Sequence, residues 1–166
     1  EDSFGTIISL NHSASVEMRY YRNNILHTYV LSSLISRLLT HNREISHEQV
    51  LSQTISLLAT LKEDLFLWQS SEQITIQVDQ VLTALENSGV ANKKSANIWS
   101  LAKDSQQLSQ VHLMAECIDE SIQRLAIITS LATRLAPVTR RDLEQKVVAI
   151  AKRLAVINNI TAPEFI

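Results

Sequence analysis

Glycine and proline are scarce in this sequence, with two of each among 166 residues. Average usage would supply about twenty in total, and the shortage of turn-forming residues argues against an all-β sandwich or barrel. The two glycines, Gly5 and Gly89, stand alone, which excludes a glycine-rich phosphate-binding loop. Leucine, isoleucine and alanine are abundant instead, so the composition favours a mainly α-helical chain.

Cysteine pairs, long apolar runs and an excess of one charge are also missing. Cys117 is the only cysteine, which excludes an internal disulfide and a cysteine-based zinc site. No apolar run reaches the roughly 18 residues of a membrane-spanning helix, and no secretory signal opens the chain. The net charge of −2 excludes a generic polyanion-binding protein. Because the first residue is Glu1 and not methionine, we expect a piece of a longer protein.

Hydrophobic periodicity predicts a multi-helix bundle. Residues 1–19 have no stable period and are expected to form an irregular lead-in. Apolar stripes and capping residues predict helices over 24–40, 46–61, 70–88, 105–136 and 140–158, with a candidate break at Asp119 and a further helix start near 161. On the first helix, Ser33 and Arg37 are expected to face away from the apolar stripe. The last full helix is expected to bury Leu143, Val147, Ile150, Leu154 and Ile157.

A short β-hairpin is predicted after the third helix, because the apolar pairs Val90-Ala91 and Ile98-Trp99 flank the polar stretch 92–95. Gly89, just before it, stands where a left-handed helix cap belongs. The order of helices and hairpin over 46–101 predicts a winged-helix-like segment, a unit that often reads DNA. Between residues 46 and 104, however, seven acidic residues oppose four basic ones. Since phosphate contacts need cations, we predict no nucleic-acid partner.

Histidine and carboxylate spacing bears on catalysis, because general acid–base chemistry needs a histidine held close to a carboxylate. None of the five histidines begins a His-x4-Asp spacing. Only His12 comes near it, with Glu17 at the matching position. We interpret His12 as a surface loop histidine and predict no catalytic residue in this chain.

The remaining candidate residues favour structural roles. Cys117 is interpreted as a buried structural thiol, and Trp68 and Trp99 as core or interface aromatics. His41 and His47 flank a loop, but no third metal ligand accompanies them. The sequence therefore predicts neither a metal nor a cofactor.

The helix predicted over 140–158 carries a basic face. Two acidic residues, Asp142 and Glu144, oppose five basic ones that lie mainly away from the apolar stripe: Arg140, Arg141, Lys146, Lys152 and Arg153. This pattern is typical of a helix lying on an anionic membrane surface. It is also typical of an ordinary solvated face over a core stripe, and both interpretations stay open.

Several blocks resemble a known family. The stretch Tyr20-Tyr21-Arg22-Asn23-Asn24-Ile25-x-His27 and the residues that follow it, 30–35 and 43–46, resemble the region after the catalytic domain in bacterial membrane-bound glycerol-3-phosphate 1-O-acyltransferases. Residues 61–67, 148–156 and 160–165 are similar to the same family. The similarity runs from about residue 18 to the end, and is looser over 69–135.

The resemblance implies that residues 20–166 form a helical C-terminal domain without catalytic residues. The catalytic acyltransferase domain, with the His-x4-Asp base, is expected upstream of this chain. The intact enzymes transfer an acyl chain from acyl-CoA or acyl carrier protein to glycerol 3-phosphate, the first step of phospholipid biosynthesis. They work at the cytoplasmic face of the bacterial inner membrane, where this chain would be peripheral. Two other classes stay open: a winged-helix-containing adaptor or regulator, and an unrelated all-α scaffold.

The segment Tyr20, Tyr21, Arg22, Asn23 and Asn24 is a candidate docking site. Three polar residues and two tyrosines precede an apolar helix, where losing solvation without partners is costly. We expect these residues to find their partners on the protein's own N-terminal acyltransferase domain.

Overall fold

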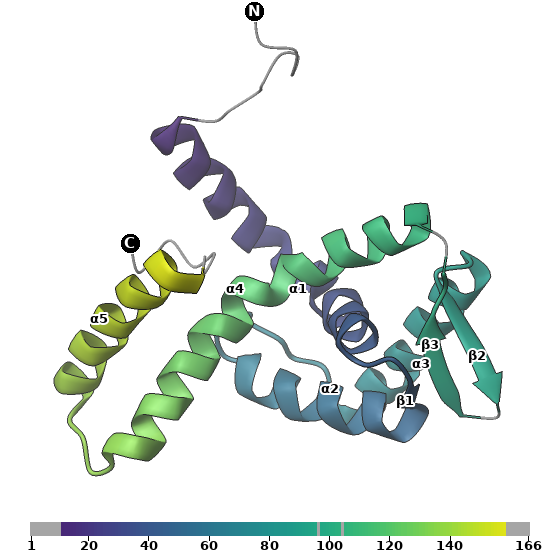
Figure 1. Ribbon diagram of the computed structural model, residues 1–166. Coiled ribbons are helices and arrows are strands. Elements are labelled where there is room, and N and C mark those ends of the chain that lie inside the picture. Colours follow the sequence, from purple (N-terminus) through teal and green to yellow (C-terminus); the bar gives the residue numbers. More distant parts are fainter. Residues whose placement is uncertain (1–10, 96, 104, 159–166) are drawn as a thin grey trace, which may run out of the picture.

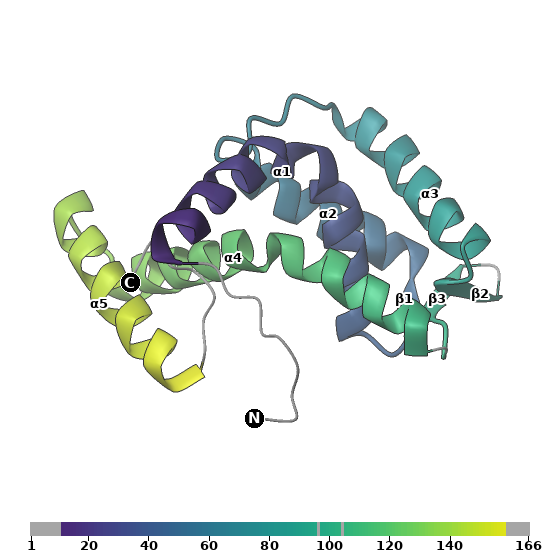
Figure 2. The same cartoon turned by 90° about the horizontal axis from the view of Figure 1, so that it is seen from above.

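The computed structural model describes residues 11–95, 97–103 and 105–158. Within these ranges the chain is mainly α-helical, as predicted, with five helices and a small three-stranded sheet in the order α1-β1-α2-α3-β2-β3-α4-α5. Figures 1 and 2 show α3 and the sheet at one end of the molecule and α5 at the other, with α4 reaching between them. The helix start predicted near 161 lies outside the described residues.

Helix α1 (His12–His41) begins well before its predicted start. Asn11 is the N-cap, and its side chain accepts a hydrogen bond from the backbone amide of Ala14 at 2.8 Å. The prediction of an irregular lead-in is therefore wrong for residues 12–19, while residues 1–10 lie outside the described ranges. The first half of α1 projects from the rest of the molecule (Figure 1).

Helices α2 (His47–Leu61) and α3 (Ser71–Asn87) begin at reciprocal capping boxes. The Ser46 hydroxyl accepts from the Gln49 amide at 3.2 Å, and the Gln49 side chain accepts from the Ser46 amide at 3.0 Å. Ser70 and Gln73 repeat this arrangement at the start of α3. Residues 62–66 form a turn between the two helices.

The predicted hairpin is present and belongs to a three-stranded antiparallel sheet, with strand order β1-β3-β2. Strand β2 (Ala91–Ser95) pairs with β3 (Ile98–Leu101), so the polar stretch expected to form the turn is strand instead. The two-residue strand β1 (Ile45–Ser46) adds to β3 with Ile45 opposite Trp99. Helix α1 precedes the segment predicted to be winged-helix-like. Within 46–101, the two helices α2 and α3 lie between β1 and the hairpin.

Helix α4 (Ser105–Leu135) packs along α1 and continues through Asp119 without the candidate break. Helix α5 (Arg140–Asn158) packs on the second half of α4, and Thr139 caps it by accepting from the Asp142 amide at 3.2 Å. Val147 is buried as predicted, whereas Ile157 is 75% exposed, so its assignment to the core is wrong. Among the described residues, no helix combines the length and apolarity that crossing a bilayer requires.

Two adjoining apolar clusters form the main core. One surrounds Trp99 and draws on α1, α2, α3 and the sheet, and the other joins α1, α2 and α4 around Ile118. Ser33 and Ser36 are completely buried in α1, so the prediction that Ser33 faces away from the core is wrong. The Ser33 hydroxyl lies 3.7 Å from Sδ of Met114 on α4, because α4 covers a face that the sequence of α1 alone presents as polar.

Candidate functional site

The segment predicted to dock, residues 20–24, lies in the projecting half of α1. The rings of Tyr20 and Tyr21 meet edge to face with centroids 5.8 Å apart, and both side chains are about two-thirds exposed. Asn23 and Asn24 are also exposed, whereas Arg22 is half-buried. Successive helical residues point about 100° apart, so Tyr20 and Tyr21 present different sides of α1 to solvent.

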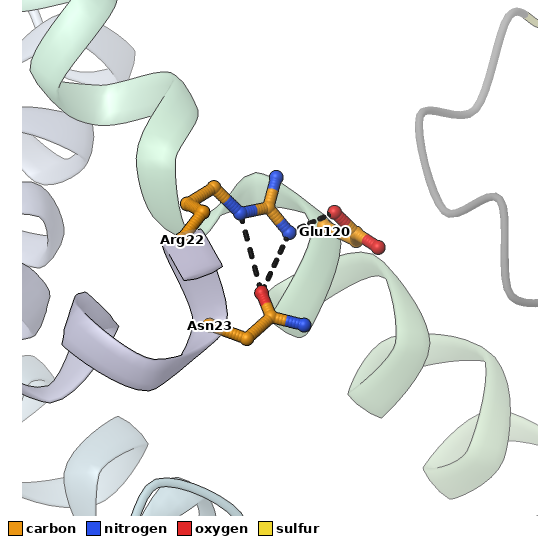
Figure 3. A network of polar contacts seen from close by, with 3 residues as sticks. All are labelled: Arg22, Asn23 and Glu120. Atoms are coloured by element: carbon orange, nitrogen blue, oxygen red, sulfur yellow. Dashed lines mark hydrogen bonds and ion pairs between the residues drawn. The ribbon is translucent and has the colours of Figure 1, made fainter. Parts of the chain in front are cut away.

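Arg22 has its partners inside this chain. Its guanidinium donates to Oδ1 of Asn23 through Nε at 3.2 Å and Nη2 at 2.9 Å, and Nη2 also pairs with Oε2 of Glu120 on α4. Figure 3 shows Arg22 reaching across from α1 toward Glu120, with the Asn23 amide below it. Glu120 is buried. The structure thus brings Arg22 and Asn23 together in a contact between helices.

A second ion pair joins the same two helices. Nε of Arg37 lies 3.1 Å from Oδ1 of Asp119, without the alignment of a hydrogen bond. Burial raises the pKa of the Asp119 carboxyl, and the charge of Arg37 only partly opposes this. Asp119 and Glu120, adjacent in α4, therefore place two acidic groups on the α1 interface. Sequence reasoning missed both contacts, since neither spacing is local.

Beside this polar contact, α1 and α4 form an apolar groove of about 360 Å³. Its lining includes Ile25 and Tyr29 from α1 and Leu113, Met114 and Cys117 from α4. Leu113 is 66% exposed. Cys117 is half-buried, not buried as predicted, and its thiol donates to the Leu113 carbonyl at 3.4 Å.

Helix α5 presents its basic residues to solvent. All five are exposed: Arg140, Arg141, Lys146, Lys152 and Arg153. Val147 and Ala151 of the same helix are buried against α4. Nε of Arg140 donates to Glu144 at 2.8 Å, one turn along the helix. Arg141, Lys146, Lys152 and Arg153 therefore lie away from the buried stripe, whereas Arg140, seven residues before Val147, lies in line with it at the helix start.

Outside these surfaces, the described histidines and tryptophans make individual contacts. No group of three or more His, Cys, Asp or Glu side chains in the described ranges is placed to hold a metal ion. Nε2 of His47 lies 3.2 Å from Oδ1 of Asp79 on α3. Trp99 belongs to the core, as predicted, while Trp68 is 74% exposed beside the His27 ring and is not a core aromatic.

The sequence of this chain is similar to those of known proteins. The model of the glycerol-3-phosphate acyltransferase C-terminal region matches residues 1–166. A glycerol-3-phosphate acyltransferase from Colwellia psychrerythraea is 57% identical over 166 residues, which is this whole chain and 20% of the relative. Those from Shewanella baltica and Pseudoalteromonas atlantica are 35% and 32% identical over 99% of this chain. The chain thus spans about a fifth of the length of these curated relatives. No solved structure matches.

Proposed function

This chain belongs to the family of glycerol-3-phosphate acyltransferase C-terminal regions, and from that premise we propose that it is the non-catalytic helical part of such an enzyme. The whole protein would transfer an acyl chain from acyl-CoA or acyl carrier protein to glycerol 3-phosphate in phospholipid biosynthesis. The observation that carries the proposal is the match over all 166 residues to one fifth of the relatives' length. The alternative of a non-enzymatic adaptor has no support from these relatives.

The catalytic residues of this reaction would lie outside the chain. Acyl transfer to an alcohol needs a base for the hydroxyl proton and stabilisation of the developing oxyanion. The sequence has no His-x4-Asp spacing, and Glu17 would set the orienting carboxylate one methylene too far from His12. His12 opens α1, at the start of the described chain.

An assay of acyl-CoA consumption that depends on glycerol 3-phosphate tests whether the catalytic residues lie outside this chain. We expect turnover from the full-length protein and none above background from residues 1–166, with helical circular dichroism as the folding control. His12→Ala should leave both results unchanged. Full-length protein without this activity would contradict the proposed function. Turnover by residues 1–166 that disappears with His12→Ala would place the active site in this chain.

The basic face of α5 supports a second part of the proposal, contact with an anionic membrane at the cytoplasmic face of the bacterial inner membrane. Residues 1–166 should bind phosphatidylglycerol vesicles better than phosphatidylcholine vesicles. Binding should weaken as salt rises, because ions screen surface charges over about 8–10 Å at physiological strength. Charge reversal at Arg140, Arg141, Lys152 and Arg153 should abolish binding, and reversal of Lys93 and Lys94 on β2 is the matched control. Equal loss from both sets, or binding insensitive to salt, would leave α5 with an ordinary solvated face.

The segment 20–24 supports a third part, docking on the enzyme's own N-terminal acyltransferase domain. Tyr20, Tyr21 and Asn24 are exposed on a part of α1 that projects from the rest of the chain. Arg22 and Asn23 contribute less to this surface than the sequence suggested, since Arg22 already pairs with Asn23 and Glu120.

A further inference from the structure

We propose that the apolar groove between α1 and α4, with the exposed stripe of α1 beside it, is covered by the preceding part of the same polypeptide. The inference rests on the proposed function, in which this chain is the C-terminal fifth of a longer enzyme. It moves the centre of docking away from Arg22 and Asn23 to a continuous apolar surface. We call this surface the α1–α4 docking surface: Met18, Tyr21, Ile25 and Tyr29 of α1 with Leu113, Met114 and Cys117 of α4.

The α1 part of this surface is a regular stripe. Met18, Tyr21, Ile25 and Tyr29 follow one another at intervals of three, four and four residues, which aligns them on one side of a helix. Their exposed fractions lie between 48% and 67%. Scattered apolar residues on a surface need no explanation, but a contiguous patch of large side chains marks an interaction site.

The α4 part continues the stripe into a hollow. Ile25 and Tyr29 line the groove together with Leu113, so the stripe and the groove form one surface. An apolar stripe beside an apolar groove is the geometry by which an amphipathic segment of polypeptide is recognised. Burying a side chain the size of Leu113 under a docked segment should raise the equilibrium constant for docking roughly ten- to a hundredfold.

Charge favours a polypeptide over an anionic lipid or acyl-CoA. Among the residues that line the groove, Arg22 alone is charged, and its guanidinium is engaged by Asn23 and Glu120. A phosphate group would find little else there to hold it. The curated relatives have about four fifths of their length outside this region, and a covalently connected segment needs little intrinsic affinity because its effective concentration is high.

Alkylation of Cys117 in the full-length protein tests whether the groove is covered. The rate of modification by N-ethylmaleimide, followed on the Cys117 peptide by mass spectrometry, should be low in the wild type. Leu113→Asn should raise it roughly tenfold or more, because the polar side chain weakens docking without adding a charge near the thiol. Ile76→Asn is the matched control: Ile76 is 58% exposed on α3, away from the groove, and its substitution should change the rate less than twofold.

A photo-crosslinking residue at position 113 of the full-length protein identifies the occupant. We expect a cross-link to a peptide upstream of α1 in the same molecule. A cross-link to a second copy, or to a lipid or acyl chain, would overturn the inference, as would rapid Cys117 alkylation in the wild type or equal rates in the Leu113→Asn and wild-type proteins. Neither readout measures activity, so a covered groove in a protein without acyltransferase activity would refute the proposed function alone.

Discussion

The body of the molecule, formed by α1, α2, α3 and the sheet, and the arm, formed by α5 with residues 127–135 of α4, bury apolar side chains in different ways. In the body, Leu34, Ile35, Val50 and Val78 are completely buried where several elements converge. The arm's cluster of Ile127, Val147 and Ala151 forms a single seam between two helices. An interface between two helices excludes less water than a core formed by several elements. The free energy of local opening should therefore be lower for the arm than the free energy of unfolding for the body.

The same comparison separates the two proposed contacts. The body and the adjoining part of α4 carry the apolar docking surface, while the arm carries the basic face, and Figures 1 and 2 place α5 at the far end from α3 and the sheet. Loss of docking and loss of membrane contact should therefore respond to different substitutions.

Leu34→Ala should have the largest effect, because it leaves a cavity in the most enclosed part of the body. We expect the free energy of unfolding to fall by about 2–5 kcal/mol, the range for buried leucines. Chemical denaturation of residues 1–166 measures it. Ile76→Ala, at an exposed position of α3, should stay within about 0.5 kcal/mol of the wild type. Equal losses from the two variants would mean that the body is no better packed than its surface.

Arg22→Ala should cost about 1–3 kcal/mol, because the variant removes the guanidinium that pairs with the buried carboxylate of Glu120. A double-mutant cycle with Glu120→Gln separates this pair from other effects of each substitution. The structure therefore makes Arg22 a test of α1–α4 pairing before it is a test of docking. An Arg22→Ala variant with unchanged stability and no coupling to Glu120 would return Arg22 to the docking surface.

Local features of the fold were predictable because their causes are local. The predicted helix start at Ser46 is confirmed, and it depends on a capping box between two residues three positions apart. Gly89 was placed at a left-handed cap, and its φ is 73°. A Cβ there would also lie 2.7 Å from Nε2 of Gln107, but this is the end of a flexible side chain, so it is the backbone conformation that favours glycine.

Features that depend on distant residues were not predictable. Arg22 and Glu120 are 98 positions apart, and nothing in either sequence neighbourhood links them. The sequence of α1 alone places Ser33 on a polar face. In the structure this face is covered by α4, whose Met114 contacts the Ser33 hydroxyl. The start of α1 was missed, although Asn11 followed by a helix-compatible sequence was an available N-cap signal. The apolar part of the candidate site lies largely outside the segment that sequence reasoning selected.

Val147→Ala should cost about 1–2 kcal/mol, in proportion to the two buried methyl groups that it removes from the seam. The loss should be confined to the arm. Amide hydrogen exchange should speed up across α5, while the amides of α2 and α3 keep their wild-type protection. Equal acceleration in α2 and α5 would show that body and arm unfold together.

Asp119→Asn should have the smallest effect on the free energy of unfolding at neutral pH, within about 1 kcal/mol, because the variant loses the attraction of Arg37 but no longer buries a charge.

The effect of Asp119→Asn should also depend on pH. Burial raises the pKa of Asp119 in the folded state, so the folded protein binds this proton more tightly than the unfolded chain. The stability that Asp119 contributes is full below its ordinary pKa and is lost as the pH rises through the folded value. The unfolding free energy of Asp119→Asn, relative to the wild type, should therefore increase as the pH rises through this window. Glu44→Gln is the control of opposite sign, because the hydrogen bond and charge of Lys94 lower the pKa of Glu44. Its stability relative to the wild type should decrease as the pH rises from that lowered pKa to the ordinary pKa of a glutamate. If both variants moved in the same direction, the attraction of Arg37 would outweigh burial at Asp119, and the α1–α4 interface would be stabilised by its charges despite their burial.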